Sequence, residues 1–304
     1  MVRHRSLDRL VRGMTALLAV VTVAALSISS QPAEAASGYT DHQGVDACDY
    51  PSTTDLNALW NGTPFWDFGY YLGGAEAAAV GCTPWTSSTL TNARTLGWGF
   101  TPIWDDLQAP TGCGPIINGK RYDFAARMSI NPTTSYNQGV ASANSALSAM
   151  GGAGFGPDDT VWLDLEGYDR TQQSCINAVN AYVNGWSTTA DFDAGVYGSA
   201  SASGVSDWAH IAHPPFAVWI ADRNINLNTV WNDPFVSNSY WVYDQRMHQY
   251  RTSQHTVKTS MPHGYDVDCL NTWADQGSNF DDETNEPNES GSLSGDPACD
   301  GTTQ

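Results

Sequence analysis

Basic residues are scarce in this sequence, which has 13 Lys and Arg against 32 Asp and Glu in 304 residues and a formal net charge of −19. So negative a surface repels the phosphate backbones of nucleic acids and the anionic lipids of membrane surfaces. The charge therefore argues against nucleic acid as a partner. It also helps to keep an exported protein in solution, so the surplus of acid does not by itself indicate a ligand.

After the first 30 residues the sequence has no apolar run of the ~20 residues that a membrane span needs. At the amino terminus, four arginines precede an apolar run from Met14 to Ile28, and a small-residue cleavage site ends at Ala35. This order predicts a secretory signal peptide over residues 1–35, with an uncleaved membrane anchor as the alternative. Cleavage leaves 9 basic and 30 acidic residues, a net charge of −21, on a protein expected outside the cell.

No two cysteines are spaced as Cys-x-x-Cys, which argues against a structural zinc site. An even number of cysteines in an exported chain predicts disulfide bonds instead, although the sequence does not choose among the pairings. All six follow the leader, at Cys48, Cys82, Cys113, Cys175, Cys269 and Cys299. The histidines at 248, 255 and 263 lack the helical i,i+4 spacing of a zinc motif, so no metal or cofactor is expected.

Short apolar runs alternate with amphipathic segments over residues 36–274, which predicts one domain. The expected strands are 44–46, 68–74, 98–104, 160–165, 194–198, 216–221, 240–250 and 264–268. Helices are expected at 87–96, with Ser87 or Ser88 as the cap, at 136–150, where Gly151 and Gly152 end the helix, at 175–186 and at 205–211. Eight strands alternating with helices or long loops predict a parallel sheet closed into a (β/α)8 barrel of the TIM type.

Two segments depart from this alternation. Residues 108–131 form a long loop that contains Cys113, and we expect it to be an insertion over the mouth of the barrel. Residues 275–304 carry eight acidic and no basic residues, a composition that predicts a disordered or loosely draped tail. Cys299 is expected to anchor this tail to the domain.

Acidic residues lie at the ends of five of the expected strands. They are Asp46 at the end of the first strand, Asp105 and Asp106 at the third, Asp164 and Glu166 at the fourth, Asp222 at the sixth, and Asp266 and Asp268 at the eighth. In a barrel these strand ends meet on one face, where the active site lies. Crowded carboxyls raise one another's pKa, so one of them can keep a proton near neutral pH and act as a general acid.

Asp164 and Glu166 are the acids with the most informative spacing. Residues i and i+2 of a strand face the same way and lie about 6.6 Å apart, within the range of about 5–9.5 Å between the paired carboxyls of glycosidases. A lone Asp-x-Glu is more often a solvated loop or a helix cap, and clustered carboxylates can also bind calcium. The acids at the other strand ends favour glycoside chemistry, while no EF-hand spacing supports calcium.

Tryptophan is abundant, with 12 residues in the chain. Aromatic planes stack on the apolar faces of sugar rings, so a cleft rich in tryptophan suits a polysaccharide. Trp104, beside Asp105, is the predicted subsite residue, whereas Trp162 and Trp219 lie within apolar strands and are expected in the core. The run Gly195 to Gly198 lacks the serine of a nucleophile elbow, which argues against a serine hydrolase.

Seven short motifs occur in a characteristic order. They are Gly44-Val-Asp46-Ala-Cys48, Phe68-Gly-Tyr-Tyr-Leu-Gly-Gly74, Thr101-Pro-Ile103, Trp162-Leu-Asp-Leu-Glu166, Gly195-Val-Tyr-Gly198, His248-Gln-Tyr250 and Asp266-Val-Asp268. This set resembles the bacterial glycoside-hydrolase-like domain known as domain of unknown function 1906, which is similar in plan to the family 25 lysozymes. The resemblance covers about residues 44–271 and implies a (β/α)8 barrel that acts on, or binds, cell-wall glycan.

The resemblance also implies roles for single residues. An Asp-x-Glu on the fourth strand of the lysozymes supplies the acid, which implies Glu166 as proton donor and Asp164 as the group that orients the substrate N-acetyl group or stabilises charge. Asp46 matches the first-strand aspartate, and either Asp266 or Asp268 matches the last. The residues expected to bind substrate are Tyr71, Trp104, Asp105, Tyr197, Asp222, Gln249 and Tyr250. One departure is Cys48, because the lysozymes usually carry Asp-x-Ser at that strand.

Two functions are compatible with these features. The first is a secreted glycoside hydrolase that cleaves peptidoglycan or a related amino-sugar polysaccharide. The second is a non-catalytic cell-wall or glycan-binding barrel of glycosidase ancestry. In both cases the expected partner is a polysaccharide, the protein is expected to be a monomer, and no cofactor, nucleic acid or membrane is involved after signal cleavage.

Overall fold

The computed structural model describes residues 37–40, 42–156, 159–189, 192–201, 204–223, 229–243, 245–255 and 257–275. The predicted signal peptide, Cys299 and the predicted tail from residue 276 onward lie outside these ranges. None of the helices in the described ranges is long and apolar enough to cross a membrane.

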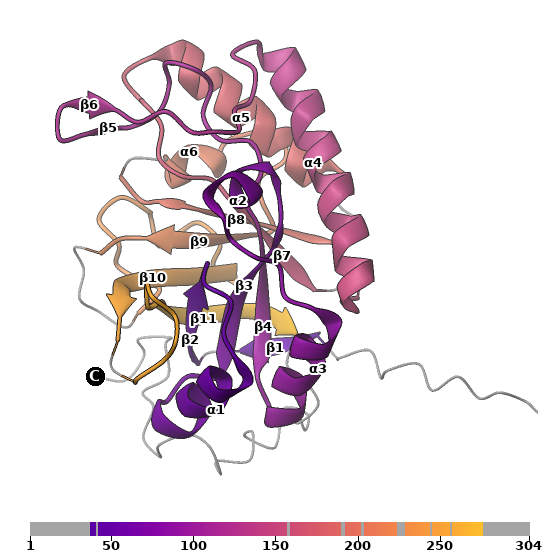
Figure 1. Ribbon diagram of the computed structural model, residues 1–304. Coiled ribbons are helices and arrows are strands. Elements are labelled where there is room, and N and C mark those ends of the chain that lie inside the picture. Colours follow the sequence, from indigo (N-terminus) through magenta and orange to yellow (C-terminus); the bar gives the residue numbers. More distant parts are fainter. Residues whose placement is uncertain are drawn as a thin grey trace, which may run out of the picture. The chain divides into compact units, whose positions relative to one another are not determined.

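Eight strands close into a barrel (Figure 1). In barrel order they are β2 (Gln43–Ala47), β3 (Asp67–Gly73), β4 (Gly99–Trp104), β7 (Thr160–Asp164), β8 (Asp193–Ser199), β9 (Ala217–Ala221), β10 (Gln245–Gln254) and β11 (Tyr265–Asp275). The predicted α/β barrel is confirmed. A short strand that the sequence did not predict, β1 (Ser37–Thr40), pairs with the far end of β11.

The last barrel strand runs against the others. The strands from β2 to β10 pair in parallel, whereas β11 is antiparallel to both β10 and β2, and these two pairings close the barrel. The prediction that all eight strands are parallel is therefore wrong. Residues 255–264 join β10 to β11, and this connection is shorter than the dozen or more residues that a parallel crossover requires.

Six helices lie in the described ranges. They are α1 (Thr53–Gly62), α2 (Ala75–Val80), α3 (Ser87–Leu96), α4 (Pro132–Ala153), α5 (Gln173–Thr188) and α6 (Val205–Trp208), of which α1 and α2 were not predicted. Two predicted caps are wrong. Thr86 rather than Ser87 or Ser88 caps α3, because its hydroxyl accepts the N–H of Thr89, and α4 ends at the left-handed cap Gly154 rather than at Gly151 and Gly152.

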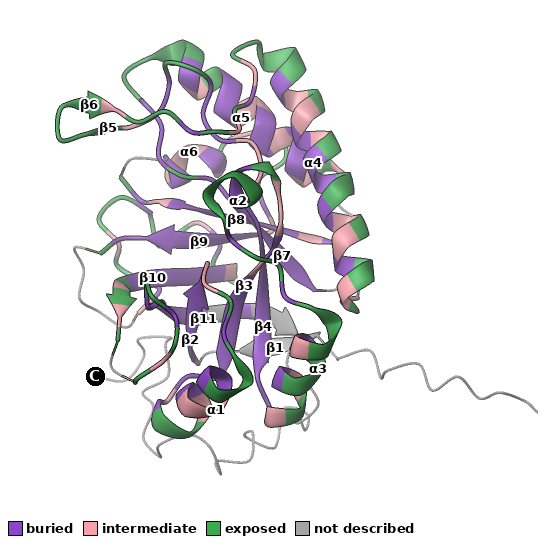
Figure 2. Cartoon of the chain, in the orientation of Figure 1, coloured by how far each residue is buried: buried purple, intermediate pink, exposed green. Residues whose placement is uncertain are grey.

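Helices α4 and α5 lie side by side at the upper right of Figure 1. Glycines permit their close approach, because a Cβ on Gly139 would lie 2.1 Å from the carbonyl oxygen of Tyr182. Figure 2 shows how each helix turns a buried stripe toward the strands and an exposed stripe outward. The buried residues of the strands and these stripes form the core, as the alternating apolar segments of the sequence predict.

The segment before β10 is a loop rather than a strand. Residues 240–243 were predicted to begin this strand, but β10 starts at Gln245 and Trp241 has a left-handed φ of 47°. The cause is the buried guanidinium of Arg246, which donates hydrogen bonds to the carbonyls of Tyr240 and Ser237 at 2.6 and 2.5 Å. Because a buried cation must have its donors satisfied, the chain folds around Arg246 instead of extending.

Disulfide bonds are present as predicted. Cys48, after β2, pairs with Cys82, after α2, and Cys113 in the long loop pairs with Cys175 in α5. Cys269 in β11 is also disulfide-bonded. Each of the two complete bridges ties a loop at the carboxyl end of a barrel strand to a neighbouring helix or loop.

Replacing Cys113 and Cys175 together with Ala is expected to lower the free energy of unfolding by about 4 kcal/mol, because the bond joins residues separated by 62 positions and restricts the unfolded chain. Urea denaturation followed by tryptophan fluorescence measures the difference. The double Cys48→Ala, Cys82→Ala variant is the comparator, since its separation of 34 positions predicts a slightly smaller loss. A loss below about 1 kcal/mol for the first variant would contradict the expectation.

Candidate active site

The carboxyls of four sequence-predicted acids meet in one cavity at the mouth of the barrel. Asp46 lies in β2, Asp164 ends β7, Glu166 follows β7, and Asp266 lies near the start of β11. Because β11 is antiparallel, its beginning reaches the same end of the barrel as the carboxyl ends of the other strands. The cavity has a volume of about 110 Å³, and its remaining lining residues are Tyr71, Ile103, Tyr197, Trp219, Arg223 and Gln249.

Asp46 is held by a chain of buried hydrogen bonds. The amide of Gln249 donates to Asp46 Oδ2 at 2.8 Å, and the Tyr197 hydroxyl donates to Gln249 Oε1 at 3.1 Å. Burial, together with the charge of Asp266, raises the pKa of Asp46 to about 8. Asp46 therefore holds a proton over much of the neutral range.

Asp268 lies behind Asp46 and does not line the cavity. Its carboxyl shares a hydrogen bond with Asp46 and accepts the indole N–H of Trp219 at 3.0 Å. Burial, and then the neighbouring Asp46, raises its pKa well above the usual range. The sequence left Asp266 and Asp268 as alternatives for the last-strand aspartate of the site. In the structure Asp266 lines the cavity, whereas Asp268 contacts Asp46 from the buried side.

Asp164 is the buried member of the Asp-x-Glu pair. It accepts the hydroxyl of Tyr71 on Oδ2 at 3.2 Å, while its buried Oδ1 has no hydrogen-bond partner among the described residues. Burial, followed by the charges of Asp105 and Glu166, raises the pKa of Asp164 well above the usual range. A protonated Asp164 therefore has a hydrogen-bond donor to offer.

Glu166 is the exposed member of the pair. Its backbone N–H donates to Gln108 Oε1 at 2.9 Å, so the side-chain amide of Gln108 fixes the chain where Glu166 leaves the strand. Desolvation between the walls of the mouth raises the pKa of Glu166, and the opposite charge of Arg223 counteracts this rise. Glu166 is therefore a carboxyl that is accessible to solvent and whose raised pKa allows it to act as a proton donor.

A second cavity of about 360 Å³ adjoins the first and shares Tyr71, Asp164 and Glu166 with it. Asp105 lies in its wall and accepts Gln108 Nε2 at 2.8 Å; burial raises the pKa of Asp105 to about 8. The long loop supplies the opposite wall, which confirms the prediction of an insertion over the mouth.

Three predicted substrate-binding residues do not reach either cavity. Trp104 is buried toward α4 and donates its indole N–H to Ser142 at 3.0 Å, and the Tyr250 hydroxyl donates to Gln43 at 2.7 Å. Asp222 is buried at the end of β9. Strand alternation explains the first two, because Trp104 and Tyr250 each adjoin a residue that faces the site and must therefore face away from it.

The cavity also contains residues that the sequence-based prediction missed. Trp219 is buried in the core as predicted, but it also lines the first cavity and donates its indole N–H to Asp268, a role that alternation along β9 could have indicated. Among the described residues, Arg223 is the one cation that lines the first cavity, and Gln108 connects Asp105 to the backbone of Glu166. Gln108 lies outside every predicted strand, so the sequence gives no indication that its side chain connects the two acids.

No group of three or more His, Cys, Asp and Glu side chains within the described ranges is arranged to hold a metal ion. The carboxyls instead contact amides, hydroxyls and an indole. Among the four acids of the first cavity, Glu166 is the one most accessible to solvent.

Comparisons with known proteins give one family and a set of similar folds. No curated protein matches the chain. An uncharacterized protein of B. stearothermophilus aligns with 13% identity over 75% of this chain and 95% of that chain, with a TM-score of 0.49. The Tat-secreted protein Rv2525c of Mycobacterium tuberculosis, solved with L-tartrate, aligns with 14% identity over 76% and 96%, with a TM-score of 0.48.

A family 25 glycosyl hydrolase of Bacillus anthracis aligns with 14% identity over 75% of this chain and 88% of that chain, with a TM-score of 0.40. The sequence itself matches the Rv2525c-like, glycoside hydrolase-like domain over residues 58–270, which include most of the barrel. This confirms the resemblance found in the motifs, and the chain belongs to the family of Rv2525c-like, glycoside hydrolase-like domains.

Proposed function

We propose that the protein is a secreted glycoside hydrolase that cleaves peptidoglycan or a related amino-sugar polysaccharide, with Glu166 as the general acid. The observation that carries this proposal is the position of Glu166, an accessible carboxyl of raised pKa beside three further acids in one cavity. Glycoside hydrolysis needs a carboxylic acid that protonates the departing oxygen and negative charge that stabilises an oxocarbenium-like transition state.

The three acids beside Glu166 differ in how well they can supply this negative charge. Asp266 accepts the N–H of Ser253 at 2.8 Å and faces Arg223, and both contacts oppose the rise in its pKa that burial causes. We assign Asp266 as the ionised carboxylate that stabilises positive charge on the sugar. Asp164 keeps its proton and orients the substrate N-acetyl group, while Asp46, fixed by Gln249, supports the sugar ring.

One observation favours the alternative of a non-catalytic glycan-binding barrel. Arg223 lines the cavity with Glu166 and favours the ionised form of that carboxyl, which is the form that cannot protonate a leaving group.

Incubation of the processed protein with purified peptidoglycan and with neutral amino-sugar oligosaccharides distinguishes the two functions. The hydrolase is expected to release new reducing ends, detected by borohydride labelling and by the masses of the fragments. Saturable binding without any new reducing end between pH 4 and pH 8 would reject hydrolysis and support the binding function.

A further inference from the structure

The wall of the second cavity opposite the acids is apolar although it faces solvent. It is formed by the hairpin of β5 (Ile116–Ile117) and β6 (Lys120–Arg121) and the residues around it, with Ile117 and Tyr122 lining the cavity. Their exposed fractions are 54% and 46%. The Cys48–Cys82 disulfide lines the same cavity. Exposed apolar side chains around a cavity commonly mark a binding site.

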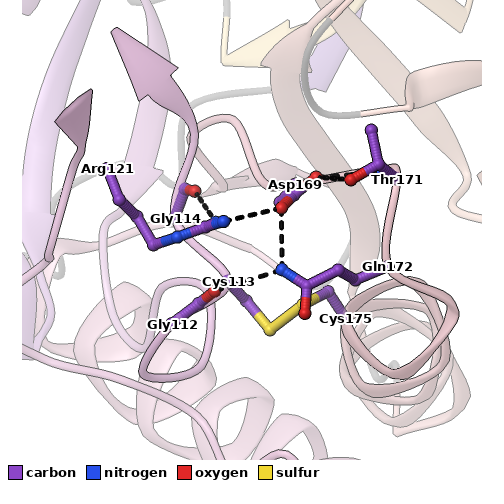
Figure 3. The surroundings of a disulfide bond; sticks show 8 residues. All are labelled: Gly112, Cys113, Gly114, Arg121, Asp169, Thr171, Gln172 and Cys175. Atoms are coloured by element: carbon purple, nitrogen blue, oxygen red, sulfur yellow. Dashed lines mark hydrogen bonds and ion pairs between the residues drawn. A yellow bond between two sulfur atoms is a disulfide. The ribbon is translucent and has the colours of Figure 1, made fainter. Parts of the chain in front are cut away.

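A network of polar contacts and a disulfide hold this hairpin in place (Figure 3). The Cys113–Cys175 bond anchors its base to α5, and Arg121 forms an ion pair with Asp169 at 2.8 Å. Hydrogen bonds from Thr171, Gln172 and Arg121 hold the pKa of Asp169 well below its usual range, so Asp169 stays ionised. The hairpin is therefore a fixed wall, and a ligand that binds against it has less conformational entropy to overcome.

A second brace fixes the chain that leaves the hairpin. The carboxylate of Glu76 in α2 accepts the backbone N–H groups of Ala125 and Ala126 at 3.1 and 2.5 Å. Both ends of the segment that carries Ile117 and Tyr122 are thus connected to the barrel side of the molecule. These contacts hold the side chains of Ile117 and Tyr122 in exposed positions at the mouth of the barrel.

The charge of the second cavity limits what can bind there. Its polar lining consists mainly of the carboxyls of Glu76, Asp105, Asp164 and Glu166, and none of the lining residues in the described ranges is Lys, Arg or His. An anionic group would therefore find no opposite charge among the described lining residues of this cavity. Arg223 lines only the first of the two cavities, which share Glu166.

We propose that the second cavity is a subsite for a neutral amino-sugar ring, which places its apolar face on Ile117 and Tyr122 and its polar edge toward the carboxyls. This inference rests on the proposed function for the identity of the ligand as a glycan, but it does not require that the glycan be hydrolysed.

The test measures binding by calorimetry to the processed protein carrying Glu166→Gln, which prevents turnover. The probes are N-acetylchitotetraose, which is neutral, and a galacturonate tetramer, which is anionic. Ile117→Ala and Tyr122→Ala are each expected to weaken binding of the neutral probe about tenfold or more, because each removes part of the apolar wall. The anionic probe is expected to bind at least about tenfold more weakly than the neutral one.

The chain offers matched controls for both substitutions. Ile116 adjoins Ile117 on the same strand, is 60% exposed and does not line the cavity, and Tyr243 is 80% exposed outside it. Ile116→Ala and Tyr243→Ala are expected to leave binding unchanged. Equal effects of the lining and control substitutions, preference for the anionic probe, or no saturable binding of the neutral probe would each overturn the subsite.

Reducing-end release by the wild type separates this inference from the proposed function. If the wild type cleaves no glycan but the lining substitutions weaken binding selectively, hydrolysis is rejected and the subsite stands. If the wild type cleaves glycan and the lining substitutions leave KM and Kd unchanged, the subsite is rejected and hydrolysis stands.

Discussion

Replacing Glu166 with Gln is expected to lower kcat on a cell-wall glycan by about 10²- to 10⁴-fold, the usual contribution of a general acid. Gln keeps the size of the side chain and can accept or donate hydrogen bonds, but it cannot transfer a proton to the departing oxygen. Because the backbone N–H of Glu166 makes the contact with Gln108, the substitution leaves that anchor intact. Single-turnover release of reducing ends measures the change, and calorimetry shows whether binding survives.

Asp222→Asn is the matched control for this substitution. The sequence pattern placed Asp222 in the same ring of acids, but the structure buries it outside both cavities. Its amide variant is expected to keep kcat within about twofold of the wild type. Equal losses of kcat in the two variants would contradict the role of Glu166, because the effect would then follow from removing any strand-end acid.

The pH profile supplies an independent check on Glu166. Its raised pKa means that the protonated, active form persists above the pH at which an ordinary glutamate ionises. The rate should therefore fall as the pH rises through this raised pKa, and Arg223→Gln should move the fall to higher pH by removing the opposing charge. A fall that moves to lower pH in Arg223→Gln would contradict the placement of this cation.

Predictions based on the position of a residue in a strand identified more of the site than predictions based on the type of side chain. Asp46 in β2 and the pair Asp164 and Glu166 at the end of β7 were found because apolar runs locate strand ends, and the barrel brings those ends together. Trp104 was assigned to the site by its type and its proximity to Asp105. The alternation of the strand would have placed these two neighbours on opposite faces, as the structure does.

Other features depend on contacts between distant parts of the chain. The loop before β10 was predicted as strand because its aromatic residues favour strands, but the buried Arg246 requires their carbonyls. The direction of β11 also follows from its closure onto β2 rather than from its own composition. Gln108 illustrates the limit, because a loop residue acquires its role only when the two acids that it connects are brought together.

Raising the pH from 5 to 9 is expected to destabilise the folded protein, with a steady loss between pH 5 and pH 8 that levels off above pH 8. Burial raises the pKa of both Asp46 and Asp105 to about 8, whereas the same carboxyls titrate near 4 in the unfolded chain. A raised folded-state pKa gives stability that is fully present below the unfolded pKa and is lost as the pH rises through the folded pKa. The native state binds more protons than the unfolded state throughout this window.

The magnitude for Asp46 alone, with a pKa raised from 3.8 to about 8, is on the order of 5 kcal/mol. The cluster as a whole gives less than the sum of such values, because carboxyls that share protons titrate together.

Asp46→Asn removes one of these groups while keeping an oxygen that can accept the amide of Gln249, so it should reduce the slope of unfolding free energy against pH. Urea titrations at several pH values measure that slope. Asp123→Asn, at a side chain 62% exposed, is the control and should leave the slope as in the wild type; a slope that Asp46→Asn does not change would show that Asp46 ionises in the folded protein as it does in water.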